Sequence, residues 1–455
     1  MAGHVAAMRA LRAGQHPLGF DPFGEHDDSR SEASDDHDVE PAGELNSDDE
    51  KLASSGVKAG AASSIGGDPA KAVSPPAAAK AEALKALNTL WTSACTAIYE
   101  DEDAEVFCVR WSPDDTLLAA GCGDGAVRIF NADSGKLTYV LERDAAMARL
   151  PTTCLRFRPP TEVSKTKNVL LVGNADGTVQ HWHITSRKCM HTITEENNQV
   201  YAIDYGCDGR QFASGGKDYT VRVYDEATKT CVVSLCGGFG KEHAGHSNRI
   251  FALKFSPSDG QILLSAGWDN TVLVWDLRTE TTLYSLYGPH ICGDALDLLG
   301  DRLLTGSWRP QQQLEVWDLR AKEVEHHIAW KPSATGPTDP CQVYAAQFSK
   351  CEVAGRRLIA AGGSGANELR LFDAETRGAI GRLAMPRGVY GLDFSHGGTM
   401  LAVAGGDSAV RVLAVPPHGG ELRADAEAKA KAAAPHKARG TDEAVELDAS
   451  ALEVD

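Results

Sequence analysis

Residues 263–276 read Leu-Leu-Ser-Ala-Gly-Trp-Asp-Asn-Thr-Val-Leu-Val-Trp-Asp, which is two apolar runs separated by a polar turn. The first run is rich in small residues, and the second alternates as a half-buried β-strand does. The Asp between them is typical of a tight hairpin turn. A further apolar run, Ile-Phe-Ala-Leu-Lys-Phe-Ser-Pro, precedes them at residues 250–257. The segment therefore predicts three consecutive strands.

Seven copies of this segment lie between Val106 and Ala414. They recur at intervals of roughly 40 to 55 residues, which is the spacing of propeller blades. The third strand of most copies ends at an aromatic residue, usually followed by Asp. These ends are Phe130-Asn131, Trp182-His183, Tyr224-Asp225, Trp275-Asp276, Trp317-Asp318, Phe372-Asp373 and Leu413-Ala414.

The repeat resembles the WD-repeat (WD40) family, and the resemblance covers about two-thirds of the chain. It implies an all-β, seven-bladed β-propeller. In that family a His, a Ser or Thr, the turn Asp and the Trp of a blade form a hydrogen-bonded tetrad. Only the fourth copy carries all of them, and they are His246, Ser265, Asp269 and Trp275. The turn Asp is missing from copies five and six.

The ends of the repeat region indicate how the ring closes. Residues 91–99 have a strand-like sequence and lie where an outer strand before the first copy belongs. The last copy runs into Pro416-Pro417 instead of a fourth strand. We therefore expect the N-terminal strand to complete the last blade, which removes the open sheet edge. The predicted propeller spans residues 91–415.

The flanking segments lack the pattern of a folded core. We predict a disordered, acidic, Ser/Ala-rich arm over residues 1–75, one short helix over 76–90, and an Ala- and charge-rich disordered tail over 416–455. Residues 21–50 hold thirteen Asp and Glu against one Arg. Ser47, which precedes acidic residues, and Ser74, which precedes a Pro, are candidate phosphorylation sites.

Composition narrows the class of function. The net charge is −18 without a compensating Lys/Arg cluster, which disfavours nucleic acid as a partner. No apolar run approaches the roughly 18 residues of a membrane helix. The eleven Cys residues include no C-x-x-C pair and suit a reducing compartment. We expect an intracellular protein, with the cytoplasm preferred and the nucleus or a cilium as alternatives.

Motifs for catalysis, metal binding and cofactor binding are missing from the sequence. It contains no G-x-S-x-G, Walker loop or H-E-x-x-H. Gly-rich pieces such as residues 362–365 are in register with the repeat and are interpreted as hairpin glycines. We therefore expect neither an enzyme nor a bound metal or cofactor.

The strongest functional pattern is the residue after the first apolar residue of each copy's first strand. These residues are Phe107, Thr153, Tyr201, Phe251, Asp294, Tyr344 and Tyr390. Five of the seven are aromatic, although aromatic residues are only 7% of the chain. In WD-repeat propellers this position lies at the upper mouth of the central channel and commonly contacts peptides. The residue before the turn Asp adds Trp268 and its equivalent Trp308, with Lys217, Arg249 and Arg309 nearby.

Two interpretations of these aromatic residues stay open. Clustered rings can form a desolvated pocket for an Arg, Lys or apolar side chain of a partner. Alternatively, the rings fill the channel wall and pack on one another. We predict a non-catalytic scaffold in a multiprotein complex, which binds a peptide or loop of a partner protein at this mouth.

Three alternative functions are also considered. Residues 263–278 resemble the box of WD-repeat substrate receptors of cullin-4 ubiquitin ligases, and residues 317–320 repeat its last four residues. Arg278 and Arg320 are then the candidate contacts with the ligase adaptor. The acidic arm also suits a chaperone or assembly factor for basic proteins. A structural component of a ciliary assembly is the third alternative.

Overall fold

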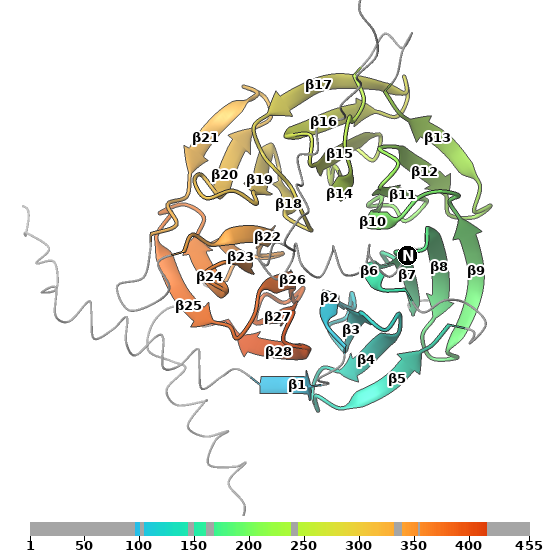
Figure 1. The fold of residues 1–455 in the computed structure, drawn as a ribbon, viewed down its shortest axis with the longest axis horizontal. Helices are drawn as coiled ribbons and strands as arrows, with labels where there is room; N and C mark the ends of the chain where they lie inside the picture. The colour runs from blue at the N-terminus through green and yellow to red at the C-terminus, as the bar shows by residue number, and fades with distance from the viewer. Residues whose placement is uncertain are drawn as a thin grey trace, which may run out of the picture. The chain divides into compact units, whose positions relative to one another are not determined.

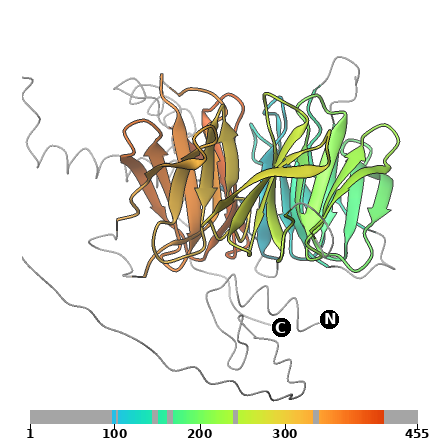
Figure 2. The ribbon, with the colours of Figure 1, turned by 90° about the horizontal axis from the view of Figure 1, so that it is seen from above.

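The computed structural model describes residues 96–100, 104–143, 150–160, 168–237, 244–331, 339–353 and 355–415. In these residues, 28 strands form seven four-stranded sheets. Figure 1 shows the sheets arranged as blades in a ring around a central axis, and Figure 2 shows them from the side. The all-β, seven-bladed propeller predicted from the sequence is therefore confirmed.

Each blade runs from an innermost strand at the channel to an outer strand (Figure 1). The innermost strands of blades one to seven are β2 (Val106–Trp111), β6 (Thr152–Phe157), β10 (Val200–Tyr205), β14 (Ile250–Phe255), β18 (Leu296–Leu299), β22 (Gln342–Phe348) and β26 (Val389–Phe394). The second strands are β3 (Leu117–Cys122), β7 (Val169–Asn174), β11 (Gln211–Gly216), β15 (Ile262–Gly267), β19 (Arg302–Gly306), β23 (Leu358–Ser364) and β27 (Met400–Gly405).

The outer half of each blade follows the same order. The third strands are β4 (Val127–Asn131), β8 (Thr178–His183), β12 (Val221–Asp225), β16 (Thr271–Asp276), β20 (Leu314–Asp318), β24 (Glu368–Asp373) and β28 (Ala409–Ala414). The outer strands are β5 (Leu137–Leu141), β9 (Lys188–Thr194), β13 (Cys231–Leu235), β17 (Thr281–Tyr287), β21 (Glu323–His327), β25 (Ala379–Ala384) and β1 (Thr96–Glu100).

The last blade takes its outer strand from the other end of the repeat region. Its strand order is β1-β28-β27-β26, and Glu100 of β1 lies opposite Ala409 of β28. The predicted closure by an N-terminal strand is therefore confirmed. The predicted arm over 1–75, helix over 76–90 and tail over 416–455 lie outside the described residues, as do Ser47 and Ser74.

The apolar core lies between neighbouring blades. One cluster joins Ile129 of blade one to Leu155, Leu170 and Trp182 of blade two, all of them buried. Equivalent clusters occur at the other junctions, including one that joins Trp111 of blade one to Val410 of blade seven. Because neighbouring blades cover each sheet on both faces, the strands in the inner half of each blade have nearly continuous apolar sequences.

The innermost strands carry a β-bulge near their upper end in six of the seven described blades. The register shifts between the residues that flank Phe107, Thr153, Tyr201, Phe251, Tyr344 and Tyr390. A bulge leaves one residue out of the pairing and re-aims its side chain. In blade five, β18 pairs with β19 without a shift and begins at Leu296, so Asp294 precedes the strand. Six of the seven residues chosen from the sequence pattern therefore lie at bulges, and Asp294 is the exception.

Candidate functional site

Two groups of side chains surround the central channel, an aromatic group at the upper end and a charged group below it. The upper end is where the innermost strands begin, and the lower end is where they turn into the second strands. The bulges place the aromatic side chains, and the regular part of each innermost strand places the charged ones. The hydrogen bonds that brace single blades from within lie outside both groups.

The four residues that resemble a tetrad form one hydrogen-bonded chain in blade four. The two ring nitrogens of His246 lie 2.6 Å from a carboxylate oxygen of Asp269 and 2.6 Å from Ser265 Oγ. The indole N–H of Trp275 donates to the same hydroxyl at 2.7 Å. Ser265 and Trp275 are fully buried. This chain ties the loop before β14 to the sheet, which is a structural role.

Other blades are braced by buried glutamates, which the sequence analysis did not find. In blade three the hydroxyl of Tyr224 donates to Glu195 at 2.8 Å, and Asn198 donates to it at 2.6 Å. In blade six the indole of Trp330 donates to Glu368 at 2.6 Å. A Glu in an otherwise apolar or turn segment is the only sequence signal for such a brace.

The five aromatic residues of the predicted ring are buried, with exposed fractions between 3% for Phe251 and 6% for Phe107 and Tyr201. The ring of Phe107 stacks on that of Tyr390 at 5.9 Å between centroids, and Tyr201 stacks on Phe251 at 4.7 Å. Tyr344 meets Tyr390 edge-on at 5.8 Å. The rings therefore cover one another, as the channel-wall interpretation expects. A small cavity of about 30 Å³ is lined by four of them, Phe107, Tyr201, Phe251 and Tyr390.

Four side chains at the upper end form a continuous row, which we call the upper row: Arg249, Trp268, His290 and Trp308. The Arg249 guanidinium lies 5.1 Å from the Trp268 ring centroid. The His290 ring lies between the two indoles, with centroids 6.3 Å from Trp268 and 6.4 Å from Trp308. The indoles are half-buried, in contrast to the rings behind them.

The polar atoms of the upper row differ in their bonding. The indole N–H of Trp268 donates to Cys292 Sγ at 2.9 Å. The indole N–H of Trp308 has no hydrogen-bond partner among the described residues. Burial lowers the pKa of His290, and the charge of Arg309 acts in the same direction. The row therefore presents one charged group, two indoles and a neutral imidazole.

The other predicted cations of this face have different surroundings. Arg309 bonds the Gly288 carbonyl at 2.9 Å and pairs with the buried Glu315 at 2.7 Å, so its charge is used within blade five. Lys217 lies half-buried in the turn after β11, where its backbone N–H donates to the Gln199 carbonyl at 3.0 Å. The charge of Arg309 is therefore neutralised within the fold.

A second group lies lower in the channel and was not found in the sequence analysis. Each innermost strand contributes one polar residue, immediately before Trp111 or its equivalent. We call these residues the charged ring; they are Arg110, Arg156, Asp204, Lys254, Asp297, Gln347 and Asp393. The available signal was a polar residue at the same place in every copy, charged in six of the seven, but a search for apolar periodicity alone does not detect it.

The acceptors of the charged ring hold the backbone of the next blade. Each accepts the N–H of the residue at the end of the neighbouring innermost strand. The pairs are Asp204 with Phe255 at 2.8 Å, Asp297 with Phe348 at 2.9 Å, Gln347 with Phe394 at 2.9 Å and Asp393 with Trp111 at 2.8 Å. Since these bonds cross the blade junctions, the charged ring helps to close the propeller.

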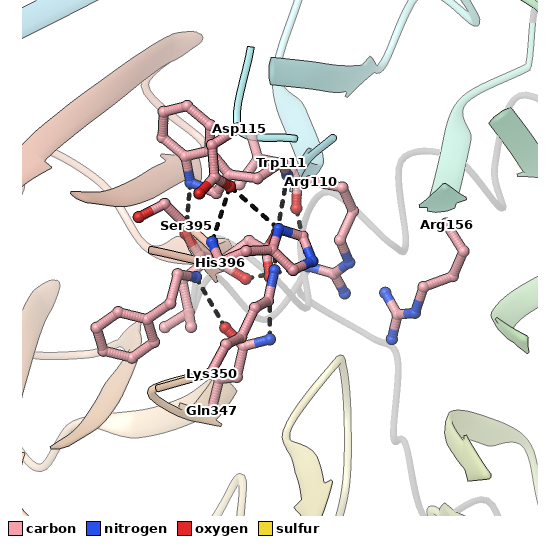
Figure 3. A network of polar contacts seen from close by, with 12 residues as sticks. Arg110, Trp111, Asp115, Arg156, Gln347, Lys350, Ser395 and His396 are labelled. Atoms are coloured by element: carbon pink, nitrogen blue, oxygen red, sulfur yellow. Dashed lines mark hydrogen bonds and ion pairs between the residues drawn. The ribbon is translucent and has the colours of Figure 1, made fainter. Parts of the chain in front are cut away.

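Cations neutralise the acids of the charged ring. Arg156 lies 3.0 Å from Asp204, Lys254 lies 2.7 Å from Asp297, and Lys350 lies 2.9 Å from Asp393. Figure 3 shows Arg110, Trp111, Gln347 and Lys350 around the junction of blades seven and one. Burial alone would raise the pKa of Asp393, but the charges of Lys350 and Arg110, with hydrogen bonds, lower it to about 2.

Below the charged ring lies a cavity of about 290 Å³. Pro113, Pro159 and His396 line it together with the charged ring. No three or more His, Cys, Asp or Glu residues in the described part of the chain are arranged to hold a metal ion. Burial also raises the pKa of the channel thiols, to about 12 for Cys108 and about 11 for Cys154, so both stay protonated.

The two arginines of the predicted ligase box lie on adjacent blades. Arg278 is 53% exposed and bonds both carboxylate oxygens of Asp259, at 2.9 and 3.0 Å. Arg320 is 80% exposed and pairs with Asp301 at 2.5 Å. Each arginine is thus exposed but held by an Asp of its own blade.

Comparison with known families decides the family. Residues 187–225 and 237–276 match the WD domain, G-beta repeat, and residues 80–160 match the WD40 domain of anaphase-promoting complex subunit 4. These matches and the seven four-stranded blades agree on one family. The chain is a WD-repeat protein.

Curated relatives of this WD-repeat chain belong to several kinds of assembly. It is 24% identical to the periodic tryptophan protein 2 homolog of Caenorhabditis elegans, over 48% of this chain and 22% of that protein. It is 26% identical to transcription initiation factor TFIID subunit 5 of the same organism, over 40% and 25%. It is 22% identical to cell division cycle 20.1, cofactor of APC complex, of Arabidopsis thaliana, over 54% and 53%.

The WD-repeat chain spans between about a fifth and about half of the length of these relatives. The fold and the family support the general class of protein-interaction scaffold. No helix that could cross a membrane occurs in the part of the chain that the structure describes.

Proposed function

We propose that this WD-repeat protein is a non-catalytic scaffold that binds a peptide or loop of a partner protein at the upper row. One observation carries the proposal. The indoles of Trp268 and Trp308 stay half-buried at the upper end of the channel, while the aromatic residues behind them are buried. Half-buried indoles next to a packed base are the usual anchors of protein interfaces.

The chemistry of the upper row favours one kind of partner segment. Arg249 already covers a face of Trp268, which leaves little π-surface there for a second cation. Arg249 adds positive charge beside Trp268, and Lys217 adds a cation in the turn after β11 of the neighbouring blade. An extended segment with an apolar anchor and an acidic neighbour therefore suits this surface better than a basic one.

Removal of both indoles tests the proposal. In affinity purification followed by mass spectrometry, Trp268→Ala with Trp308→Ala is expected to lose a specific partner of the wild-type protein. A hot-spot loss of about 2 kcal/mol or more, a factor of about 30 in affinity, is expected for such anchors. The matched control is Tyr287→Ala, because Tyr287 is 76% exposed on β17 and lies outside the upper row. An unchanged partner set from a double variant that melts like the wild type would show that the upper row is not the interface.

A ubiquitin-ligase substrate receptor is the second candidate function. The observation that favours it is the pair of exposed arginines, Arg278 and Arg320, at equivalent places on adjacent blades. Asp259 and Asp301 hold both guanidinium groups in place, which limits the entropy that an adaptor contact would cost.

The two arginines give this candidate a direct test. Arg278→Ala with Arg320→Ala is expected to abolish co-purification of the cullin-4 adaptor while the upper-row partner is retained. Arg210→Ala is the control, since Arg210 is 77% exposed and pairs with Asp208 in blade three outside the box. Retained adaptor binding by the double variant removes the receptor function.

The remaining alternatives depend on other evidence. The chaperone for basic proteins rests on the acidic arm, which lies outside the described residues, and no described residue favours a ciliary role. The relatives include a TFIID subunit and the U3 small nucleolar RNA-associated protein 15 homolog of Xenopus tropicalis. We therefore propose an intracellular protein of a multiprotein complex, with the nucleus now favoured over the cytoplasm.

A further inference from the structure

Asp294 is the exception among the residues that surround the channel. It occupies the place that aromatic residues hold in five other blades, but it lies on a bend before β18 and not at a bulge. Its backbone carbonyl accepts the N–H of Ala346 at 3.2 Å, which anchors the main chain. Its side chain reaches down to the charged ring.

Two arginines of the charged ring converge on this carboxylate. Nη2 and Nη1 of Arg156 lie 3.1 and 3.3 Å from the two oxygens of Asp294, a bidentate contact. Arg110 forms an ion pair with the same carboxylate. The arginines come from blades one and two, whereas Asp294 comes from blade five. The acid and the cations are thus supplied from opposite sides of the channel.

The two arginines need an anion between them. Their side chains are only 8% and 14% exposed. Burial and the charge of Arg156 together lower the pKa of Arg110 to about 10, against the opposing charge of Asp393. Two buried guanidinium groups that repel each other are stable together only when an anion neutralises them. Arg156 also pairs with Asp204, and Asp294 supplies the anion that the two arginines share in this structure.

Asp294 differs from the other acids of the channel in two respects. Asp204, Asp297 and Asp393 each accept a backbone N–H of the next blade, and their side chains are at most 10% exposed. The carboxylate of Asp294 is 32% exposed, and its only partners within the described part of the chain are the two arginines. It can therefore leave the arginines without breaking a blade junction.

We propose that Arg110 and Arg156 form a carboxylate-binding site in the channel, and that Asp294 is a built-in occupant which a carboxylate ligand displaces. The planar fork of Arg matches a carboxylate in two-point contact, as Asp294 itself demonstrates with Arg156. This site is separate from the upper row and does not depend on it.

The cavity below the charged ring has room for such a ligand. Its volume of about 290 Å³ corresponds to about ten water molecules at roughly 30 Å³ each. Arg110, Arg156 and Asp294 all line this cavity. The ligand is either a small organic acid or the Asp or Glu side chain of a partner loop that enters from the lower end.

Malonate binding at constant ionic strength, measured by calorimetry, tests the site. Asp294→Asn is expected to bind malonate at least about tenfold more tightly than the wild type, since the competing carboxylate is gone. Adding Arg156→Gln to Asp294→Asn should abolish this binding. Asp301→Asn is the matched control, because Asp301 pairs with Arg320 outside the channel and its loss should leave malonate binding at the wild-type level.

A short peptide with one Glu and blocked ends distinguishes the two sources of the carboxylate. Binding of both malonate and the peptide to Asp294→Asn supports a partner loop, and binding of malonate alone supports a small acid. Binding of neither to the folded variant overturns the proposal. If Asp294→Asn does not fold in chloride, refolding that malonate restores supports the site, and failure in both salts at equal ionic strength overturns it.

Discussion

Replacement of Asp393 by Ala is expected to lower the free energy of unfolding by about 3–5 kcal/mol, because it removes one partner of a buried ion pair at the closing junction of the ring. The Asp393 side chain is 1% exposed. It accepts from the Trp111 N–H at 2.8 Å, from Gln347 at 3.0 Å and from Lys350 at 2.9 Å. Without it, the Lys350 ammonium and the Trp111 N–H lose their acceptor inside the channel.

Denaturant-induced unfolding at several pH values measures this loss. The pKa of Asp393 is about 2 in the folded protein, below the value of about 3.9 expected for an unfolded Asp. A lowered pKa gives stability that is present above about pH 4 and lost as the pH falls towards 2. Asp393→Ala should therefore lack this part of the acid-induced loss, and the two proteins should converge in stability at low pH.

A matched substitution separates the junction from a general loss of negative charge. Asp301→Ala removes an acid that is 55% exposed and pairs with Arg320, so it should cost less than about 1 kcal/mol. Equal midpoints for Asp393→Ala and the wild type at neutral pH would mean that the charged ring does not hold blades seven and one together.

The architecture could be predicted from the sequence because each copy contains the residues that mark its own strands and turns. Strand, turn and aromatic terminus recur within each segment, and local pattern is enough to assign them. The outer strands were harder, since β9 and β13 expose most of their residues and have no apolar face to detect. Their existence followed from the repeat spacing and not from their own sequence.

The burial of the aromatic ring could not be predicted in the same way. Tyr201 and Phe251 contact each other because both sit at bulges of adjacent innermost strands. A bulge is a property of the pairing between two strands, and the sequence around Phe251 has no Gly or Pro that marks one. The pairing of Asp294 with Arg156 could not be predicted from the sequence either, because the two residues are 138 positions apart and meet only across the closed ring.

Replacement of Trp275 by Ala is expected to cost about 3–5 kcal/mol of folding free energy, the usual range for a fully buried Trp. The indole is 0% exposed, packs between blades three and four, and donates to Ser265 at 2.7 Å. Trp275→Phe keeps most of the packing and removes the donor, so about 1–2 kcal/mol is expected from the hydrogen bond alone.

The comparison with Trp308→Ala makes the result specific to the position of the indole. Trp308 is half-buried, and its N–H has no partner among the described residues, so its loss should lower the unfolding midpoint far less than Trp275→Ala. Equal losses at the two positions would contradict the distinction between bracing and partner-binding tryptophans. A large loss at Trp275 with little loss at Trp308 would mean that the Trp308 indole contributes little to stability. A large apolar ring at the upper end of the channel would then have another role, and partner binding is the role that we propose.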